Sequence, residues 1–355
     1  MGKKIVVGMS GGVDSSVAAY LLKKSGYEVI GVSMRMWCPK DSEDVHDVTA
    51  DAKRVAEQLG VSFQVLDFQA EFLHAVMDYF AAEYLAGRTP NPCIACNRYI
   101  KWEALLAKAR ELGAEGIATG HYAKILQSDN GRYAVCRAKS AAKDQTYALY
   151  RLTQDQLKHT LMPLGDYEKD TIREIAKEIA LPVAEKKDSQ EICFIPDHDY
   201  VRFIKEHTGA KSIPGNFIGT NGEKMGIHEG IIHYTVGQRK GLGAFGRPVF
   251  VKEIRPKTNE VVLGSGDEVF QSSLVCDELN CMAAEAFHEG DEAVAKIRYS
   301  HKGAPCVLHP CGEGRLRVEF LEPQRAITPG QAVVLYQGDV VLGGGVICSN
   351  GTQPV

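Results

Sequence analysis

The sequence opens with a short apolar strand that runs directly into a glycine-containing turn. Residues 4–16 read Lys-Ile-Val-Val-Gly-Met-Ser-Gly-Gly-Val-Asp-Ser-Ser. The β-branched run Ile5–Val7 is typical of a strand that is buried on both faces. The following segment, Val17–Leu22, places its apolar residues at helical spacing. The chain therefore begins with a strand–turn–helix unit, which favours an α/β fold.

The turn itself has the composition of a phosphate cradle. Gly11 and Gly12 allow positive φ and a close backbone approach, and Ser15 and Ser16 add hydroxyl donors at a helix start. Neither a Walker A run nor a Gly-x-Gly-x-x-Gly run occurs at this turn. A helix-capping turn is the structural alternative, because Asp14 and the serines suit N-cap positions. The pattern Ser-Gly-Gly-Val-Asp-Ser resembles the PP-loop of ATP pyrophosphatases, which split ATP between the α- and β-phosphates.

Length and cysteine content limit the class of protein. With 355 residues, the chain suggests two or three domains. It holds no apolar run long enough to span a membrane, and Ile5–Val7 is too short for a signal peptide, so we expect a cytoplasmic protein without a membrane partner. In that compartment the ten cysteines indicate thiols, metal ligands or catalytic groups before disulfides.

Global charge gives no support to nucleic-acid binding. The formal net charge is −4, and residues 271–355 contain six Lys/Arg against ten Asp/Glu. Any RNA must therefore be bound by local patches, such as the one formed by Lys139 and Lys143. Taken alone, that patch is more typical of a solvated surface than of a binding site.

The first half of the chain alternates strands and helices. We expect strands at 29–34, 61–66 and 116–119, and helices at 45–59, 68–85 and 98–112. This rhythm predicts a doubly wound parallel sheet, in which ligands bind beyond the carboxyl ends of the strands. The glycine turn, Met34 and Gly120 all fall at such ends, although ordinary packing and turn chemistry would also explain the last two.

The residue pattern of the sequence changes near Gly209. Before it, residues 150–205 read as mostly helical, with a helix at 167–180 capped by Asp166 and another at 197–207. After it, short β-like runs alternate with Gly and Pro turns. We predict a catalytic domain at 1–207, a small β-rich domain at 208–272 and, at 273–355, a small closed β barrel of five or six strands.

Two cysteine segments carry the candidate chemistry. Asn91-Pro92-Cys93-Ile94-Ala95-Cys96-Asn97 lies between two predicted helices. Cys96 would precede a helix beginning near Arg98, so the helix dipole and that arginine should lower its pKa. Cys193 stands between polar and apolar residues, as at the rim of a buried site, although a buried structural thiol fits equally well.

Metal binding by cysteine stays open at this point. Cys93 and Cys96 form a Cys-x-x-Cys pair, which suits a redox pair, half a zinc site or part of an iron–sulfur site. Cys193 could supply a third ligand and leave one position for a sulfur atom. The pairs Cys276–Cys281 and Cys306–Cys311, with His309 nearby, could hold zinc, but buried small hydrophobes are the commoner explanation.

A series of motifs in a fixed order makes the resemblance specific. After the PP-loop and the segment 91–97 come Thr119-Gly120-His121-Tyr122-Ala123, Lys143-Asp144-Gln145-Thr146-Tyr147, Gln190-Glu191-Ile192-Cys193-Phe194-Ile195, Tyr234-Thr235-Val236-Gly237-Gln238-Arg239 and Pro329-Gly330-Gln331-Ala332-Val333. Over nearly its full length the chain resembles tRNA-specific 2-thiouridylases. That resemblance implies a PP-loop domain, a central domain and a C-terminal barrel that together thiolate the wobble uridine of tRNAs for lysine, glutamate and glutamine.

The resemblance also implies residue roles. Cys96 would be the nucleophile and Cys193 the persulfide carrier. ATP would be bound by Gly8, Met9, Ser10, Gly11, Gly12, Val13, Asp14, Ser15, Met34 and Gly120. Asn91, Pro92 and Cys93 would face the target base, although some members have Asp at the position of Cys93. The tRNA contacts would be His121, Lys143, Asp144, Gln145, Arg298, Tyr299 and Gln331, and Tyr147 is a candidate stacking partner.

The implied reaction needs ATP, Mg²⁺, tRNA and a sulfur source. The uracil C2 oxygen would attack the α-phosphate, and a persulfide on Cys193, supplied by an upstream cysteine desulfurase or sulfur-relay protein, would then attack C2. Cys96 would release the sulfur through a disulfide with Cys193. The alternatives are an iron–sulfur cluster on Cys93, Cys96 and Cys193, a PP-loop amidotransferase or ligase acting on a small carbonyl compound, and a nucleotide-binding module without chemistry.

Overall fold

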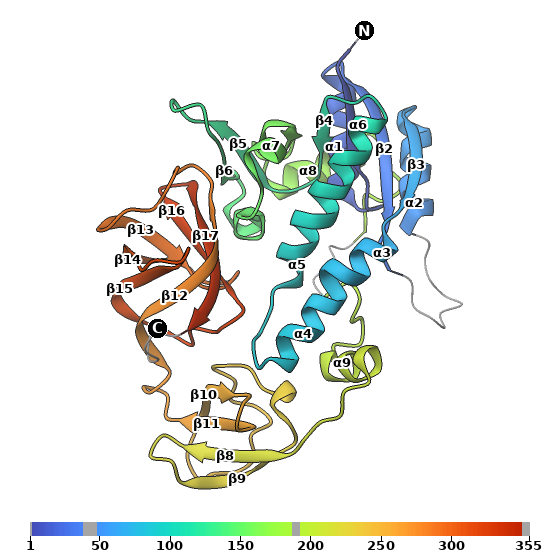
Figure 1. Ribbon diagram of the computed structural model, residues 1–355. Coiled ribbons are helices and arrows are strands. Elements are labelled where there is room, and N and C mark those ends of the chain that lie inside the picture. The colour runs from blue at the N-terminus through green and yellow to red at the C-terminus, as the bar shows by residue number, and fades with distance from the viewer. Residues whose placement is uncertain (1, 38–47, 187–191, 350–355) are drawn as a thin grey trace. The chain divides into compact units, whose positions relative to one another are not determined.

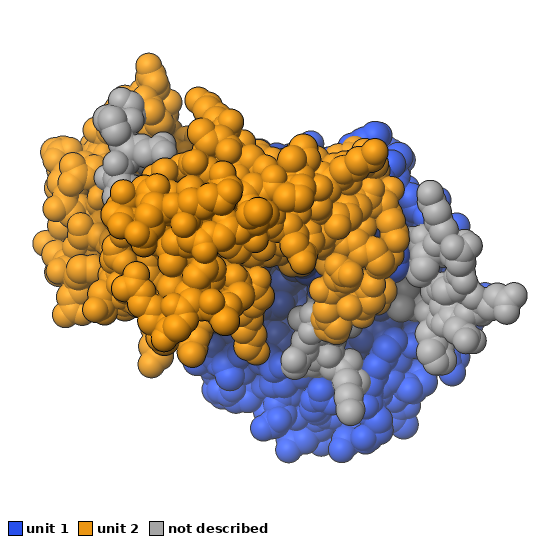
Figure 2. Space-filling model, turned by 90° about the horizontal axis from the view of Figure 1, so that it is seen from below, with its two compact units in different colours: residues 1–76, 93–194, 339–341 blue, residues 77–92, 195–338, 342–355 orange. Residues whose placement is uncertain are grey.

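A computed structural model describes residues 2–37, 48–186 and 192–349 of the chain (Figure 1). Contacts divide it into two compact units, coloured separately in Figure 2: residues 1–76, 93–194 and 339–341 form unit 1, and residues 77–92, 195–338 and 342–355 form unit 2. Residues 45–47 of one predicted helix, and Gln190 and Glu191 of one motif, lie outside the described residues. No described helix is long and apolar enough to cross a membrane.

Unit 1 is built around a parallel sheet with the strand order β3-β2-β1-β4-β7. In β1, Ile5 and Val7 join a core cluster with residues of the helices α1, α2 and α8, while Gly8 faces Leu105 of α6. Helices therefore cover both faces of the sheet, which confirms the predicted doubly wound fold. The strands are β1 (Lys4–Gly8), β2 (Glu28–Arg35), β3 (Ser62–Asp67), β4 (Gly116–Ala118) and β7 (Thr160–Leu161).

The helices of unit 1 follow the predicted order, with one shifted start. The predicted helix 98–112 begins instead at Pro92 and continues to Glu111, because proline is favoured at the first position of a helix. Its three parts are α5 (Pro92–Ala95), the wider π-type η2 (Cys96–Ala104) and α6 (Leu105–Glu111). The other helices are α1 (Val13–Lys24), α2 (Val48–Leu59), α3 (Gln69–Phe72), η1 (Leu73–Asp78), η3 (Ala141–Lys143), η4 (Thr146–Leu149), α7 (Gln154–Lys158) and α8 (Lys169–Glu178).

Two local features of unit 1 differ from the sequence prediction. Helix α8 is preceded by Glu168 and has no side-chain cap, and the predicted cap, Asp166, instead pairs with Lys124 at 2.6 Å. A hairpin of β5 (Ala123–Gln127) and β6 (Tyr133–Arg137) was not predicted. Its strands follow the Gly120-His121 turn and carry only weak alternation, so the period of two was not recognised.

Unit 2 contains the two β-rich regions predicted after Gly209, which ends α9 (Tyr200–Thr208) with a φ of +72°. The first is a sheet with the order β10-β11-β8-β9, whose core includes Phe217, Tyr234 and Val251. Its strands are β8 (Gly215–Gly219), β9 (Lys224–His228), β10 (Phe250–Arg255) and β11 (Glu260–Gly264). Unit 2 also contains α4 (Tyr79–Leu85) and η5 (Ile231–His233).

The second β-rich region is a closed barrel, as predicted. The order β12-β15-β14-β13-β16-β17 is closed into a barrel by pairing of β12 with β17. The strands are β12 (Phe270–Cys281), β13 (Asp291–Lys296), β14 (Ala304–Pro310), β15 (Leu316–Arg325), β16 (Ala332–Gln337) and β17 (Val340–Ser349). The exact domain boundaries 1–207, 208–272 and 273–355 remain a proposal.

Candidate active site

The glycine turn forms a loop that its own side chains hold closed. Gly11 has a φ of +69°, and Ser15 accepts a hydrogen bond from the Ser10 N–H at 3.1 Å. No side chain caps helix α1 at Gly12. The capping alternative therefore fails, and the first N–H groups of α1 remain available to an anion.

The predicted ATP-binding residues divide into two groups. The side chains of Met9 and Val13 pack in the hydrophobic core, so only their backbone can reach a nucleotide. The other predicted residues lie at the strand ends. Gly8 and Met34 are neighbours there, since a Cβ added to Gly8 would stand 3.5 Å from the Met34 methyl group. One added to Gly120 would stand 2.6 Å from the Ser15 nitrogen. The loop, Met34 and Gly120 thus meet at the carboxyl edge of the sheet, as predicted.

Two lysines that sequence reasoning missed flank the loop. Lys169 donates to both Asp14 carboxylate oxygens, at 2.7 and 2.8 Å, and the Tyr122 hydroxyl donates to one of them at 2.9 Å. Lys186 donates to the Gly11 carbonyl at 3.0 Å and to Asp51 at 2.7 Å. Both lysines lie more than 150 residues from the loop in sequence, and neither belongs to a motif. Backbone N–H groups and two ammonium groups form a donor set that fits a polyphosphate.

The helix that begins at Pro92 carries two of the candidate thiols. Cys93 lies in its first turn and is exposed, while Cys96 follows at the start of η2 and is buried. The Cys96 sulfur lies 3.9 Å from the sulfur of Met36. Electrostatic coupling between the thiols places Cys93, Cys96 and Cys193 in one neighbourhood. The structure thus brings together three cysteines from segments about 100 residues apart.

The pKa of Cys96 is shifted in the direction opposite to the prediction. Burial raises the pKa of this thiol to about 11, and Lys101 offsets only part of that effect. The expected decrease was wrong because Cys96 lies inside the helix rather than before it, so desolvation outweighs the helix dipole. The pKa of Cys193 is also raised, first by desolvation and then by Cys93. Phe194, which packs against Phe72 with ring centroids 5.7 Å apart, anchors the Cys193 segment.

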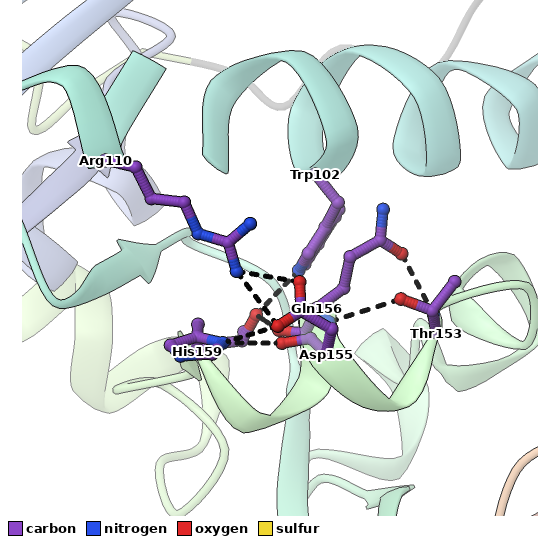
Figure 3. A network of polar contacts seen from close by, with 7 residues as sticks. Trp102, Arg110, Thr153, Asp155, Gln156 and His159 are labelled. Atoms are coloured by element: carbon purple, nitrogen blue, oxygen red, sulfur yellow. Dashed lines mark hydrogen bonds and ion pairs between the residues drawn. The ribbon is translucent and has the colours of Figure 1, made fainter. Parts of the chain in front are cut away.

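A polar network fixes the remainder of the cysteine helix (Figure 3). The indole N–H of the fully buried Trp102 donates to the Thr160 hydroxyl at 2.8 Å, which donates to the Gln156 carbonyl at 2.6 Å. Arg110 binds both carboxylate oxygens of Asp155, at 2.9 and 2.7 Å (Figure 3). The helix is therefore tied to α7 over two turns.

The Cys96 end of the helix is anchored separately. The Asn97 amide donates to the Ala148 carbonyl at 3.0 Å, and the Arg98 guanidinium donates to the Arg151 carbonyl at 3.0 Å. These contacts come from the segment that follows Lys143. The thiols consequently sit on a rigid support rather than on a loop.

The predicted tRNA contacts of unit 1 are partly engaged within the protein. The His121 ring packs at a tilt against Trp102, with ring centroids 5.2 Å apart, and burial lowers the pKa of His121 well below the usual value, so the ring is neutral near pH 7. The Gln145 side chain accepts the Tyr122 N–H at 2.9 Å. Tyr147 is fully buried, so its predicted stacking on a base was wrong. Lys143 and Asp144 are half-buried beside it.

The remaining predicted contacts lie in unit 2. Tyr299 is exposed, and Arg298 donates to the Arg325 carbonyl at 3.1 Å. Gln331 and the segment holding Asn91 and Pro92 also belong to this unit. The Gln331 amide donates to the carbonyl of Thr89, two residues before Asn91, at 2.8 Å.

The described part of the chain contains no group of three or more His, Cys, Asp or Glu arranged to hold a metal ion. In the barrel, Cys276 and Cys306 are buried in the core. Their thiols donate to the carbonyls of Leu316 and Ala293, each at 3.4 Å. This environment is that of buried small hydrophobes, as expected for the alternative to zinc.

Comparison with known families covers most of the chain. Residues 3–197 match the family model described as tRNA methyl transferase HUP domain, residues 201–265 match its PRC-barrel domain, and residues 271–347 match an aminomethyltransferase beta-barrel domain. A tRNA-specific 2-thiouridylase MnmA of Lachnoclostridium phytofermentans is 59% identical over 97% of this chain and 99% of its own length.

Two further relatives with the same name agree. The protein of Clostridium perfringens is 53% identical over 97% of this chain and 98% of its own length, and that of Clostridioides difficile is 50% identical over 98% of both. The matches cover nearly the whole length of this chain. The chain belongs to the family of tRNA-specific 2-thiouridylases.

Proposed function

We propose that this enzyme replaces the C2 oxygen of the wobble uridine of tRNAs for lysine, glutamate and glutamine by sulfur, in the cytoplasm and at the expense of ATP. Family membership supports sulfur transfer to tRNA. The observation that carries the mechanism is that unit 1 holds both a phosphate-binding loop and three neighbouring thiols. One site can therefore activate a carbonyl oxygen and deliver sulfur to the same carbon.

Activation of the uracil depends on the donors around the loop. ATP supplies the adenylyl group that turns the C2 oxygen into a leaving group. The N–H groups at the start of α1, with Lys169 and Lys186, would stabilise the departing pyrophosphate. Asp14 is the carboxylate that we assign to Mg²⁺, because this ion binds one or two carboxylates together with substrate phosphates.

Sulfur delivery would use Cys193 and Cys96 in turn. The terminal sulfur of a Cys193 persulfide attacks C2 and expels AMP, which leaves Cys193 joined to the base through two sulfur atoms. The Cys96 thiolate then attacks the Cys193 sulfur, so the S–S bond to the base breaks and the base keeps the transferred sulfur. A Cys96–Cys193 disulfide remains, and an external thiol must reduce it before the next turnover. An upstream persulfide donor, a cysteine desulfurase or a relay protein, reloads Cys193.

The high pKa of Cys96 would keep its thiol from reacting with the Cys193 persulfide before the target base is bound. At neutral pH the buried thiol is protonated and unreactive toward the Cys193 persulfide. We propose that Lys101, which lowers the pKa of Cys96, becomes more effective as the bound base excludes water from the surroundings of this thiol. Cys93, which replaces the Asp of some relatives, would then contact the base and would not act as a general base.

The test combines purified protein with ATP, Mg²⁺, a persulfide donor and tRNA that lacks the modification. Mass spectrometry of the digested tRNA distinguishes sulfur exchange from methyl addition at the wobble uridine. We expect sulfur with the wild type and none with Cys96→Ser or Cys193→Ser. Pyrophosphate release without any modified base would overturn the proposal and favour a ligase acting on a small carbonyl compound.

The iron–sulfur alternative is tested in the same preparation. The persulfide mechanism predicts full activity after aerobic purification and metal chelation. Activity only after anaerobic reconstitution, with a visible absorption band that Cys93→Ser also removes, would assign the sulfur transfer to a cluster instead. Absence of both pyrophosphate release and modified tRNA under all conditions would leave a nucleotide-binding module.

A further inference from the structure

Two sequence motifs that the proposed reaction does not use meet at one loop of unit 2. They are Tyr234–Arg239 of the middle region and Pro329–Val333 of the barrel. The loop, here called the pre-helix loop, comprises Gly87–Pro90 and leads through Asn91 into helix α5. It therefore directly precedes, in the chain, the helix whose first residue is Pro92.

The barrel binds the pre-helix loop through its backbone and one amide side chain. The Thr89 N–H donates to the Pro329 carbonyl at 2.9 Å. The Gln331 side-chain nitrogen donates to the Thr89 carbonyl at 2.8 Å and to the Pro90 carbonyl at 3.2 Å. An amide NH₂ group has two hydrogens, so these two carbonyls use its full donor capacity.

The turn that presents Gln331 is itself fixed. The Gly330 N–H donates to the Ile347 carbonyl, and the Ile347 N–H donates to the Gln331 carbonyl, both at 2.8 Å. Gly330 has a φ of +89°, and a Cβ there would lie 2.8 Å from the Thr89 nitrogen. Only glycine permits this approach, so the turn and the loop are closely fitted.

The opposite side of the loop is held by the middle region. The Thr89 hydroxyl donates to the Thr235 hydroxyl at 3.2 Å. Gly87 has a φ of +71°, and a Cβ there would lie 2.7 Å from Pro256. Arg88 forms an ion pair with the buried Glu83 of α4. Contacts therefore hold the pre-helix loop at three consecutive residues, Gly87, Arg88 and Thr89.

We propose that Gln331 is a positioning residue, whose amide orders the pre-helix loop and thereby sets Asn91 and Pro92, which belong to the same unit, for contact with the target base. The inference rests on the proposed function for the identity of the base. It differs from a direct tRNA contact in one physical respect. A phosphate or base acceptor can take a hydrogen from the Gln331 amide only by breaking a bond to the loop.

The test substitutes Gln331→Met, which keeps the length of the side chain and removes the donors without adding charge. The matched control is Gln337→Met, at the exposed end of β16. Amide hydrogen exchange in the RNA-free, full-length protein is the first measurement. Loss of the two bonds should speed exchange at Thr89 and Asn91 about fivefold, with no change in the control.

The second measurement is single-turnover thiolation at saturating tRNA, beside the dissociation constant for tRNA. A positioning role predicts a rate about tenfold lower for Gln331→Met, because small misplacements of a reacting group are costly, with the dissociation constant within about twofold of the wild type. Thr235→Val loosens the loop from the other side without touching the barrel, and it should shift exchange and rate in the same direction, by less.

Two results would overturn the inference. If Gln331→Met weakens tRNA binding about tenfold while exchange and saturated rate stay unchanged, Gln331 is a tRNA contact. If exchange rises and the rate does not fall, order in the loop is irrelevant to the reaction. Failure of the wild type to thiolate tRNA would instead refute the proposed function, since the exchange measurement needs neither tRNA nor ATP.

Discussion

The phosphate-binding loop and the cysteine cluster, both in unit 1, are built in opposite ways. The loop consists of consecutive residues, and its internal bonds join Ser10, Gly12 and Ser15. The cluster joins Cys93 and Cys96 to Cys193, and the acidity of its one buried thiol, Cys96, is set by burial and by Lys101. A site of backbone donors can be encoded locally, because each glycine and serine creates its own geometry. A site defined by desolvation depends on everything packed around it.

The largest effect that tests this comparison is expected on the nucleotide side, from Gly120→Ala. The new Cβ would stand 2.6 Å from the Ser15 nitrogen, so the loop must move. We expect tRNA-dependent pyrophosphate release to fall about 100-fold, since misplacement of positioned groups by about 1 Å has effects of this size. Gly226→Ala, where the nearest atom is 3.7 Å away, is the control. Equal loss in both variants would mean that the contact at Gly120 is unimportant.

On the sulfur side, the reaction of Cys96 with iodoacetamide should depend steeply on pH. Because its pKa is about 11, the thiolate fraction and hence the rate should rise about tenfold for each pH unit between 7 and 10. Mass spectrometry of the modified peptide gives the rate, and the exposed Cys311 in the same sample serves as the accessible reference. A rate for Cys96 that is already maximal at pH 8 would contradict the raised pKa and restore the local, helix-dipole account.

A smaller effect tests whether packing away from the thiols stabilises the helix that carries Cys93 and Cys96. Trp102→Phe removes one buried hydrogen bond and leaves the Thr160 hydroxyl its bond to Gln156. We expect the free energy of opening of η2, measured by native-state hydrogen exchange, to fall by about 1.5 kcal/mol. Trp37→Phe is the matched control, because Trp37 is only half-buried. An unchanged opening free energy would show that the network of Figure 3 does not stabilise the cysteine helix.

The smallest effect concerns Asp51 beside the loop. Hydrogen bonds from Lys186 and then Arg54 lower the pKa of Asp51 below its ordinary value of 3.8. A carboxylate with a lowered folded-state pKa stabilises the protein above its unfolded pKa and loses that contribution as the pH falls through the folded-state value. Asp51→Asn should therefore reduce the free energy of unfolding by about 0.5 kcal/mol at pH 7 and by less near pH 3. Chemical denaturation at both pH values measures the difference, and an equal loss at both would exclude the ion pairs as its cause.

Prediction from the sequence succeeded where the signal is local and periodic. The strand at Ile5–Val7, the change to β-rich structure after Gly209 and the alternating strands of the barrel followed from residue pattern alone. It failed where two local signals compete. The segment 91–97 was predicted to lie between two helices, whereas the fixed φ of Pro92 suits the first turn of the second helix.

That one displaced boundary changed the predicted chemistry. With the helix beginning at Pro92, Cys96 lies inside it and is buried, which reverses the direction of its pKa shift. Tyr147 failed for a related reason, since an aromatic residue beside a lysine suits stacking on a base and core packing equally well. Burial distinguishes the two uses, and burial is a property of the fold.

Residue pattern alone was enough to predict the PP-loop, the order of the three regions and the cysteines suited to sulfur transfer, because short-range backbone geometry and hydrophobic periodicity are encoded within a few residues. The distant groups that join them can be identified only in the folded protein. Lys169 and Lys186 reach the loop from more than 150 residues away, and Gln331 reaches Thr89 from the barrel. Such partners carry no local signature, because an ammonium or amide group acquires its role only from the acceptor that the fold places beside it.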